Sequence, residues 1–98
     1  MEQDKHTTEV IFRKYKDGEI IALFPYLIDN RFGTCQSYMH LGQHSGATLS
    51  IIDSTKLATE IEYKNLHSEL INQVGYKLKV LKKMNWNKYR KAFQKNKR

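Results

Sequence analysis

The residues TEVIFRKYKDGEIIALFPYL, numbered 8–27, decide the fold, because they have the pattern of two β-strands joined by a tight turn. Both flanks are rich in β-branched and aromatic residues, which favour strands. Between them, Asp17 and Gly18 supply the positive φ angles of a two-residue turn. In such a turn Lys16 pairs with Glu19. The sequence therefore predicts an antiparallel hairpin in this register.

This register gives the hairpin two apolar faces. One face carries Val10, Phe12, Ile21 and Leu23, and the other carries Ile11, Tyr15, Ile20, Phe24 and Tyr26. We expect each face to be covered, the second one by a helix near the C-terminus. If that cover were absent, an apolar patch would form a protein interface or a homodimer interface. Its residues would be Ile11, Ile20, Phe24 and Tyr26.

Two further strands are expected after the hairpin. Residues 34–41 alternate apolar and polar side chains, which predicts a third strand. The glycines at both ends of 42–46 indicate a turn. Residues 47–52 would then form a short fourth strand.

A central helix is predicted at about residues 59–74. Thr59 is followed three residues later by Glu62, a pair that matches a capping box at a helix start. Apolar residues follow at helical spacing. Gly75 then stands where a left-handed C-terminal cap is expected.

A strand and a basic helix are expected to complete the chain. From Tyr76 onward, apolar residues alternate with lysines, which is typical of a strand whose outward charges discourage edge-to-edge pairing. Trp86, Tyr89 and Phe93 then form one stripe of a helix at about 86–95. We expect this stripe to dock on the sheet and to leave the basic side chains in solvent.

Length and composition fit one folded domain. The chain has 98 residues, 40% of them hydrophobic, and a single Cys, so an internal disulfide is impossible. We predict one α+β domain over 1–98, with an antiparallel sheet of four to five strands and frayed ends at 1–7 and 96–98. The apolar runs are shorter than the roughly 20 residues of a membrane span, and the start lacks a signal-peptide pattern. A cytoplasmic protein is the expectation.

The charge is concentrated in the C-terminal quarter. The chain carries a net charge of +7, yet residues 76–98 contain ten Lys and Arg and no acidic residue. Cations interleaved with aromatic residues are typical of proteins that bind DNA or RNA phosphates. The candidate phosphate contacts are Lys82, Lys83, Lys88, Arg90, Lys91 and Lys95. The same pattern is also compatible with a solvated face, a protein-facing surface or contact with an anionic membrane surface.

A weak metal-site pattern lies in the middle of the chain. Cys35, His40 and His44 supply ligand types that suit zinc, but their spacing is not that of a recognised zinc finger. A fourth ligand would have to come from Asp29 or Asp53. The pattern therefore favours a half-buried cysteine beside polar histidines of the strand and turn, with no metal and no cofactor.

Catalytic motifs are missing from the sequence. It contains no P-loop, dinucleotide-binding glycine pattern, Gly-x-Ser-x-Gly elbow or His-Glu-x-x-His pair. Cys35 with a neighbouring His could form a nucleophile and base, but such a site also needs an orienting group and a substrate cleft. We therefore expect a binding protein and not an enzyme.

Two stretches, residues 10–25 and 35–44, resemble small uncharacterised proteins of gut anaerobic bacteria and their mobile elements. The resemblance implies a compact intracellular protein and supplies no activity or site residue. The sequence thus predicts a small nucleic-acid-binding protein that uses its basic C-terminal strand and helix. The alternative is a protein-interaction module, an adaptor or inhibitor, that uses the hairpin face.

Overall fold

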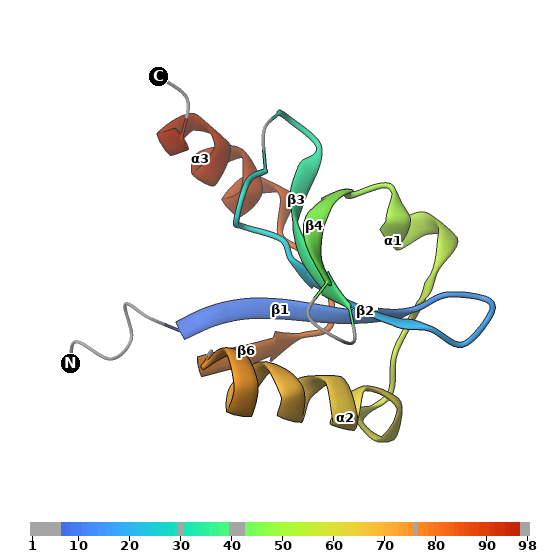
Figure 1. Cartoon of the computed structure of the whole chain (residues 1–98). Helices are drawn as coiled ribbons and strands as arrows, with labels where there is room; N and C mark the ends of the chain where they lie inside the picture. Colours follow the sequence, from blue (N-terminus) through green and yellow to red (C-terminus); the bar gives the residue numbers. More distant parts are fainter. Residues whose placement is uncertain (1–6, 30, 40–42, 76, 97–98) are drawn as a thin grey trace.

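The predicted hairpin forms the centre of a six-stranded sheet in the computed structural model, which describes residues 7–29, 31–39, 43–75 and 77–96 (Figure 1). The fold is α+β, with one central and one C-terminal helix, as predicted. The elements in chain order are β1 (Thr7–Lys14), β2 (Ile20–Phe24), β3 (Thr34–Met39), β4 (Gln43–Thr48), α1 (Ile51–Ser54), β5 (Lys56–Leu57), α2 (Glu60–Glu69), the π-helical segment η2 (Leu70–Val74), β6 (Lys77–Leu81) and α3 (Trp86–Asn96).

The sheet is mixed, whereas the prediction was a purely antiparallel sheet. Its order is β4-β3-β2-β1, and two strands share the other edge of β1. β6 runs parallel to β1 from Thr7 to Ile11, and the short β5 runs antiparallel along Arg13 and Lys14. The parallel pair arises because α2 carries the chain back along the sheet, so β6 starts at the same end as β1 (Figure 1).

The turn of the hairpin is one residue longer than predicted. The Tyr15 N–H donates to the Glu19 carbonyl (2.9 Å), and the Gly18 N–H donates to the Tyr15 carbonyl (2.9 Å). These bonds enclose a three-residue loop in which Gly18 adopts a φ of 94°. This geometry is that of a tight turn followed by a left-handed residue, the next most common hairpin connection.

The longer loop moves every β2 side chain to the face opposite the predicted one. Ile11 pairs with Leu23, and Phe12 pairs with Ala22. Phe24 and Ile20 consequently lie on the same face as Phe12, whereas they were expected to share a face with Ile11.

Helices cover both faces of the sheet, which gives three layers (Figure 1). α2 and η2 cover a cluster formed by Val10, Phe12, Ala22, Phe24, Tyr38, Ala58, Leu66 and Leu70. α1 and α3 lie over the opposite cluster, formed by Ile21, Leu23, Cys35, Leu49 and Tyr89.

The start and end of the central helix confirm the prediction from local signals. The Thr59 N–H donates to Glu62 Oε1 (2.9 Å), and the Glu62 N–H donates to Thr59 Oγ1 (3.3 Å), which completes the capping box. Gly75 ends the segment with a φ of 89°. Lys14 of β1 forms an ion pair with Glu62 and, together with Thr59, lowers the pKa of that carboxyl. This pair ties the start of α2 to the sheet.

The fourth strand begins earlier in the chain than predicted. β4 occupies Gln43–Thr48 and overlaps the predicted strand at 47–52 only at Ala47 and Thr48, since residues 43–46, expected in a turn, belong to β4. Ile51 and Ile52, predicted to lie in that strand, begin α1. Gly46 is accommodated inside β4 because the Asp29 carboxylate fills the space that a side chain would need. The third strand is confirmed over Thr34–Met39, and its remaining predicted residues lie outside the described ones.

The C-terminal elements match their predicted positions. The strand is β6, and the basic helix is α3. Of the ends predicted to fray, Thr7 lies in β1 and Asn96 ends α3, and the other residues lie outside the described ranges. In the part of the chain that the structure describes, no helix is both long enough and apolar enough to cross a membrane.

Candidate nucleic-acid interface

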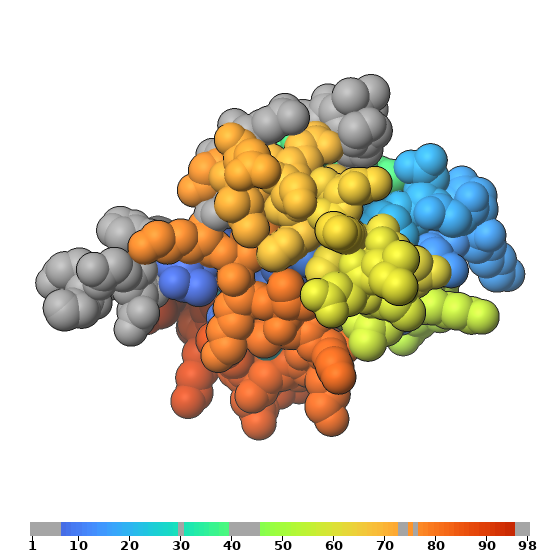
Figure 2. Space-filling view, turned by 90° about the horizontal axis from the view of Figure 1, so that it is seen from below, coloured from blue at the N-terminus to red at the C-terminus, as the bar shows by residue number. Residues whose placement is uncertain are grey.

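Two consecutive elements, β6 and α3, and the loop between them carry a group of exposed cations. We call this group the basic surface. It comprises Lys77, Lys79, Lys82, Lys83, Arg90, Lys91 and Lys95. Figure 2 shows β6 and the residues that follow it, in orange to red, as a continuous band beside α2.

A buried tyrosine holds α3 on the sheet. Tyr89 is fully buried, and its hydroxyl accepts a hydrogen bond from the Gly33 N–H (2.8 Å) and donates one to the Thr34 carbonyl (2.8 Å). At the start of the helix, Asn85 Oδ1 accepts from the Lys88 N–H (3.1 Å) as an N-cap. These contacts fix the side of α3 that faces solvent.

Lys88 differs from the other predicted phosphate contacts. Its Nζ lies 2.6 and 2.7 Å from the two carboxylate oxygens of Glu9 on β1. It also lies 4.7 Å from the centre of the Tyr26 ring, within the range of a cation–π contact. Lys88 therefore helps to join α3 to the sheet, and its charge is largely balanced by Glu9.

The other five predicted cations are exposed as well, as is Lys88 itself. Lys82 and Lys83 lie in the loop after β6, and Lys91 and Lys95 lie on the solvent side of α3. Arg90 donates from Nη1 to Asn87 Oδ1 (3.0 Å) in the same helix. The structure adds Lys77 and Lys79 of β6 to this group of exposed cations. The alternating sequence pattern predicted that these lysines point outward, but they were not among the candidate phosphate contacts.

Two exposed aromatic side chains lie at the start of α3 and next to it. Trp86 is 44% exposed and contacts Tyr89 edge-on, with ring centres 5.5 Å apart. Phe32 is 52% exposed and lies 5.3 Å from Tyr89. The helical stripe predicted Trp86 as an anchor, and Phe32 had no signal because it comes from a loop far away in the sequence.

The residues of the alternative protein interface do not form one surface. Ile20 and Phe24 pack on the α2 side of the sheet, whereas Ile11 and Tyr26 lie on the α3 side. Ile11 and Phe24 are also fully buried. The four side chains are separated because the hairpin register is one residue away from the predicted one.

Cys35 of the proposed metal pattern is a core residue. It is fully buried, and burial raises the pKa of its thiol to about 12, so that it stays protonated at neutral pH. His40 and the side chain of His44 lie outside the described residues. Within the described ranges, no group of three or more His, Cys, Asp or Glu could hold a metal ion.

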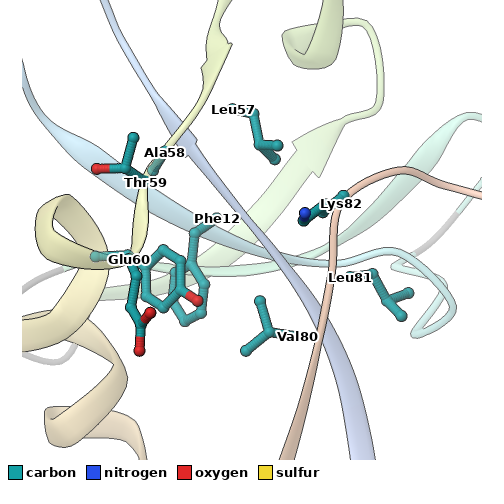
Figure 3. Close-up of a pocket in the computed structure, with 9 residues that line it drawn as sticks. Phe12, Leu57, Ala58, Thr59, Glu60, Val80, Leu81 and Lys82 are labelled. Carbon is teal, nitrogen blue, oxygen red and sulfur yellow. The ribbon is translucent and has the colours of Figure 1, made fainter.

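A pocket of about 470 Å³ opens where β5 and β6 meet at the edge of β1 (Figure 3). Its apolar lining includes Phe12, Leu57, Val80 and Leu81. Lys82 and Glu60 add one positive and one negative group to the lining. Lys82 thus belongs both to this pocket and to the basic surface.

The candidate site therefore combines cations from β6, the following loop and α3 with aromatic rings at the edge of the helix. Its position is set by Tyr89 and by the Lys88–Glu9 ion pair. Comparison of the chain with protein-family models, with curated proteins and with solved structures finds no match.

Proposed function

We propose that the protein binds nucleic acid through phosphate contacts of the basic surface and that it acts without catalysis. The observation that carries this proposal is the gathering of exposed cations from β6, the loop and α3 in a segment that contains no acidic residue. Such a group of cations attracts a polyanion. Binding is favoured because the nucleic acid releases its condensed counterions when the cations neutralise its phosphates.

The kind of binding follows from the kind of side chain. Six of the seven cations are lysines, which act on phosphates as point charges and not as planar, bidentate readers of base edges. We therefore expect little sequence preference. The dissociation constant should fall in the range of non-specific binding, roughly 10⁻⁴ to 10⁻⁶ M at physiological salt.

A pair of charge variants tests the proposal. The site variant combines Lys83→Gln, Lys91→Gln and Lys95→Gln, and the control combines Lys16→Gln, Lys56→Gln and Lys64→Gln. All six lysines are exposed, so the two variants lose the same net charge at different places. Fluorescence anisotropy would follow labelled single-stranded DNA, duplex DNA and RNA over a series of salt concentrations.

The site variant should flatten the plot of log affinity against log salt by about 0.7 for each lost contact to a single strand, or about 0.9 on duplex DNA. The control should keep the slope of the original protein. Two results would overturn the proposal. One is an absence of binding to all three nucleic acids at low salt. The other is an equal loss of slope in both variants, since that would reflect net charge and not a defined surface.

A further inference from the structure

We propose that Trp86 and Phe32 form a platform on which bases of a single-stranded nucleic acid stack. This inference rests on the proposed function and specifies its substrate class. Among the exposed large hydrophobic side chains of the described residues, these two are the aromatic ones, and the others are aliphatic. Exposed aromatic rings beside cations are the usual means by which proteins hold unpaired bases.

Both rings are supported by the same buried residue. Trp86 and Phe32 each contact Tyr89 edge-on, at interplanar angles of 75° and 68°. Phe32 also meets Phe93 of α3 at a centre-to-centre distance of 5.2 Å. The Tyr89 hydroxyl is fixed by its two hydrogen bonds to the backbone of Gly33 and Thr34. The platform is therefore ordered before binding, which reduces the entropy cost of association.

The loop that carries Phe32 is closed on itself. The Thr34 hydroxyl donates to the Arg31 carbonyl (2.6 Å), and the Thr34 N–H donates to the same oxygen (3.2 Å). Phe32 therefore projects from a short turn and not from a long open loop. Its exposure is a consequence of this turn, which places the ring at the edge of the α3 interface.

The distance between the two rings suits a short piece of strand. Each ring centre lies within 5.5 Å of the Tyr89 ring centre, so the two cannot be more than about 11 Å apart. This limit equals about three stacking steps of roughly 3.4 Å in a nucleic acid strand. Bases that lie within about three nucleotides of each other in one strand can therefore reach both rings.

The charges around the rings favour a polyanion over an apolar protein surface. Arg31 precedes Phe32, and Arg90 follows Trp86 by one helical turn, and both are exposed. Asp29, which lies in the same loop as Phe32, is directed toward Gly46 of β4. A duplex keeps its bases stacked inside the helix, so only an unpaired strand can present base faces to these rings.

The test uses the intrinsic fluorescence of Trp86, because it is the single tryptophan of the chain. The full chain would be titrated with oligothymidylate and with a duplex of the same length, while anisotropy of a labelled strand is measured in parallel. The single strand should quench Trp86 fluorescence along the same saturation curve as the anisotropy. The duplex should leave the fluorescence nearly unchanged.

Variants extend this test. Phe32→Leu should weaken single-strand binding by between about fivefold and 150-fold, the range that corresponds to the loss of one stacked base. Ile61→Ala serves as the control, since Ile61 is 88% exposed on α2, and it should leave the affinity unchanged. The quenching of the unaltered protein needs no variant, so the inference stays testable even if Phe32→Leu is unstable.

The outcomes separate the platform from the proposed function. If binding depends on salt but does not quench Trp86 fluorescence, and if Phe32→Leu binds with full affinity, the platform is overturned. The proposed role of the basic surface is then unaffected. Equal quenching and affinity for the duplex overturns the preference for single strands. An absence of binding to any nucleic acid overturns both the platform and the function on which it rests.

Discussion

At the scale of single residues, Cys35 shows how burial controls chemistry. The thiol lies in the core on β3, and burial raises its pKa from 9.0 to about 12. The thiolate, and not the thiol, is the nucleophile that attacks a disulfide reagent. We predict that Ellman's reagent leaves the folded protein unlabelled at neutral pH and labels one thiol in urea. Rapid labelling of the folded protein would contradict the burial of Cys35.

The raised pKa of Cys35 also makes the free energy of unfolding depend on pH. Below the ordinary pKa of 9.0 the thiol is protonated in both states, so Cys35 has no effect on the pH dependence. As the pH rises from about 9 toward about 12, the unfolded chain loses the proton first, and the free energy of unfolding falls. Denaturant unfolding should show this fall in the original protein, and Cys35→Ala should reduce it. Equal slopes in both proteins would contradict the shift.

Gly18 illustrates what a residue type can and cannot indicate. Asp17 followed by glycine correctly predicted a hairpin, because both common hairpin loops place glycine at a positive φ. The sequence could not distinguish a two-residue loop from a three-residue loop, since both accept the same residues. The structure has the longer loop, with Gly18 at 94°, and this single difference decided which face each β2 side chain occupies.

At the scale of elements, the attachment of α3 depends on Tyr89. We predict that Tyr89→Phe lowers the free energy of unfolding by about 1–3 kcal/mol, because it leaves the Gly33 N–H and the Thr34 carbonyl without their partner. Tyr26→Phe is the matched control. It removes the acceptor of the exposed Asn85 N–H, which water can replace, so it should cost less. Urea denaturation measures both, and a smaller loss for Tyr89→Phe would contradict this account.

Elements with local signals were predicted well. The capping residues Thr59 and Glu62 and the terminal Gly75 placed the central helix correctly, since helix ends are determined by neighbouring residues. A fourth strand was predicted, but at 47–52 instead of Gln43–Thr48, because the glycines at 42 and 46 indicated a turn. Gly46 instead lies inside β4, where the Asp29 carboxylate occupies the space of a side chain, and the local sequence pattern does not reveal this contact.

At the scale of the whole molecule, the candidate site was predicted in part. Its cations are close together in the sequence, so composition was sufficient to locate most of the basic surface. The ion pair of Lys88 with Glu9 joins residues 79 positions apart. The contact between the Phe32 ring and Phe93 of α3 also joins residues that are far apart in the sequence. Only the fold could show that Lys88 is paired with Glu9 and place an aromatic ring beside the other cations.

The most direct test of the basic surface is chemical-shift mapping of the ¹⁵N-labelled protein with a single-stranded oligonucleotide at low salt. The account predicts that amide shifts concentrate in β6, in residues 82–85, in α3 and in the Phe32 loop. The hairpin tip at Lys16–Gly18 and the exposed side of α2 should remain unchanged, and added salt should reverse the shifts. Shifts centred on α2 or the hairpin tip, or no shifts at all, would contradict it.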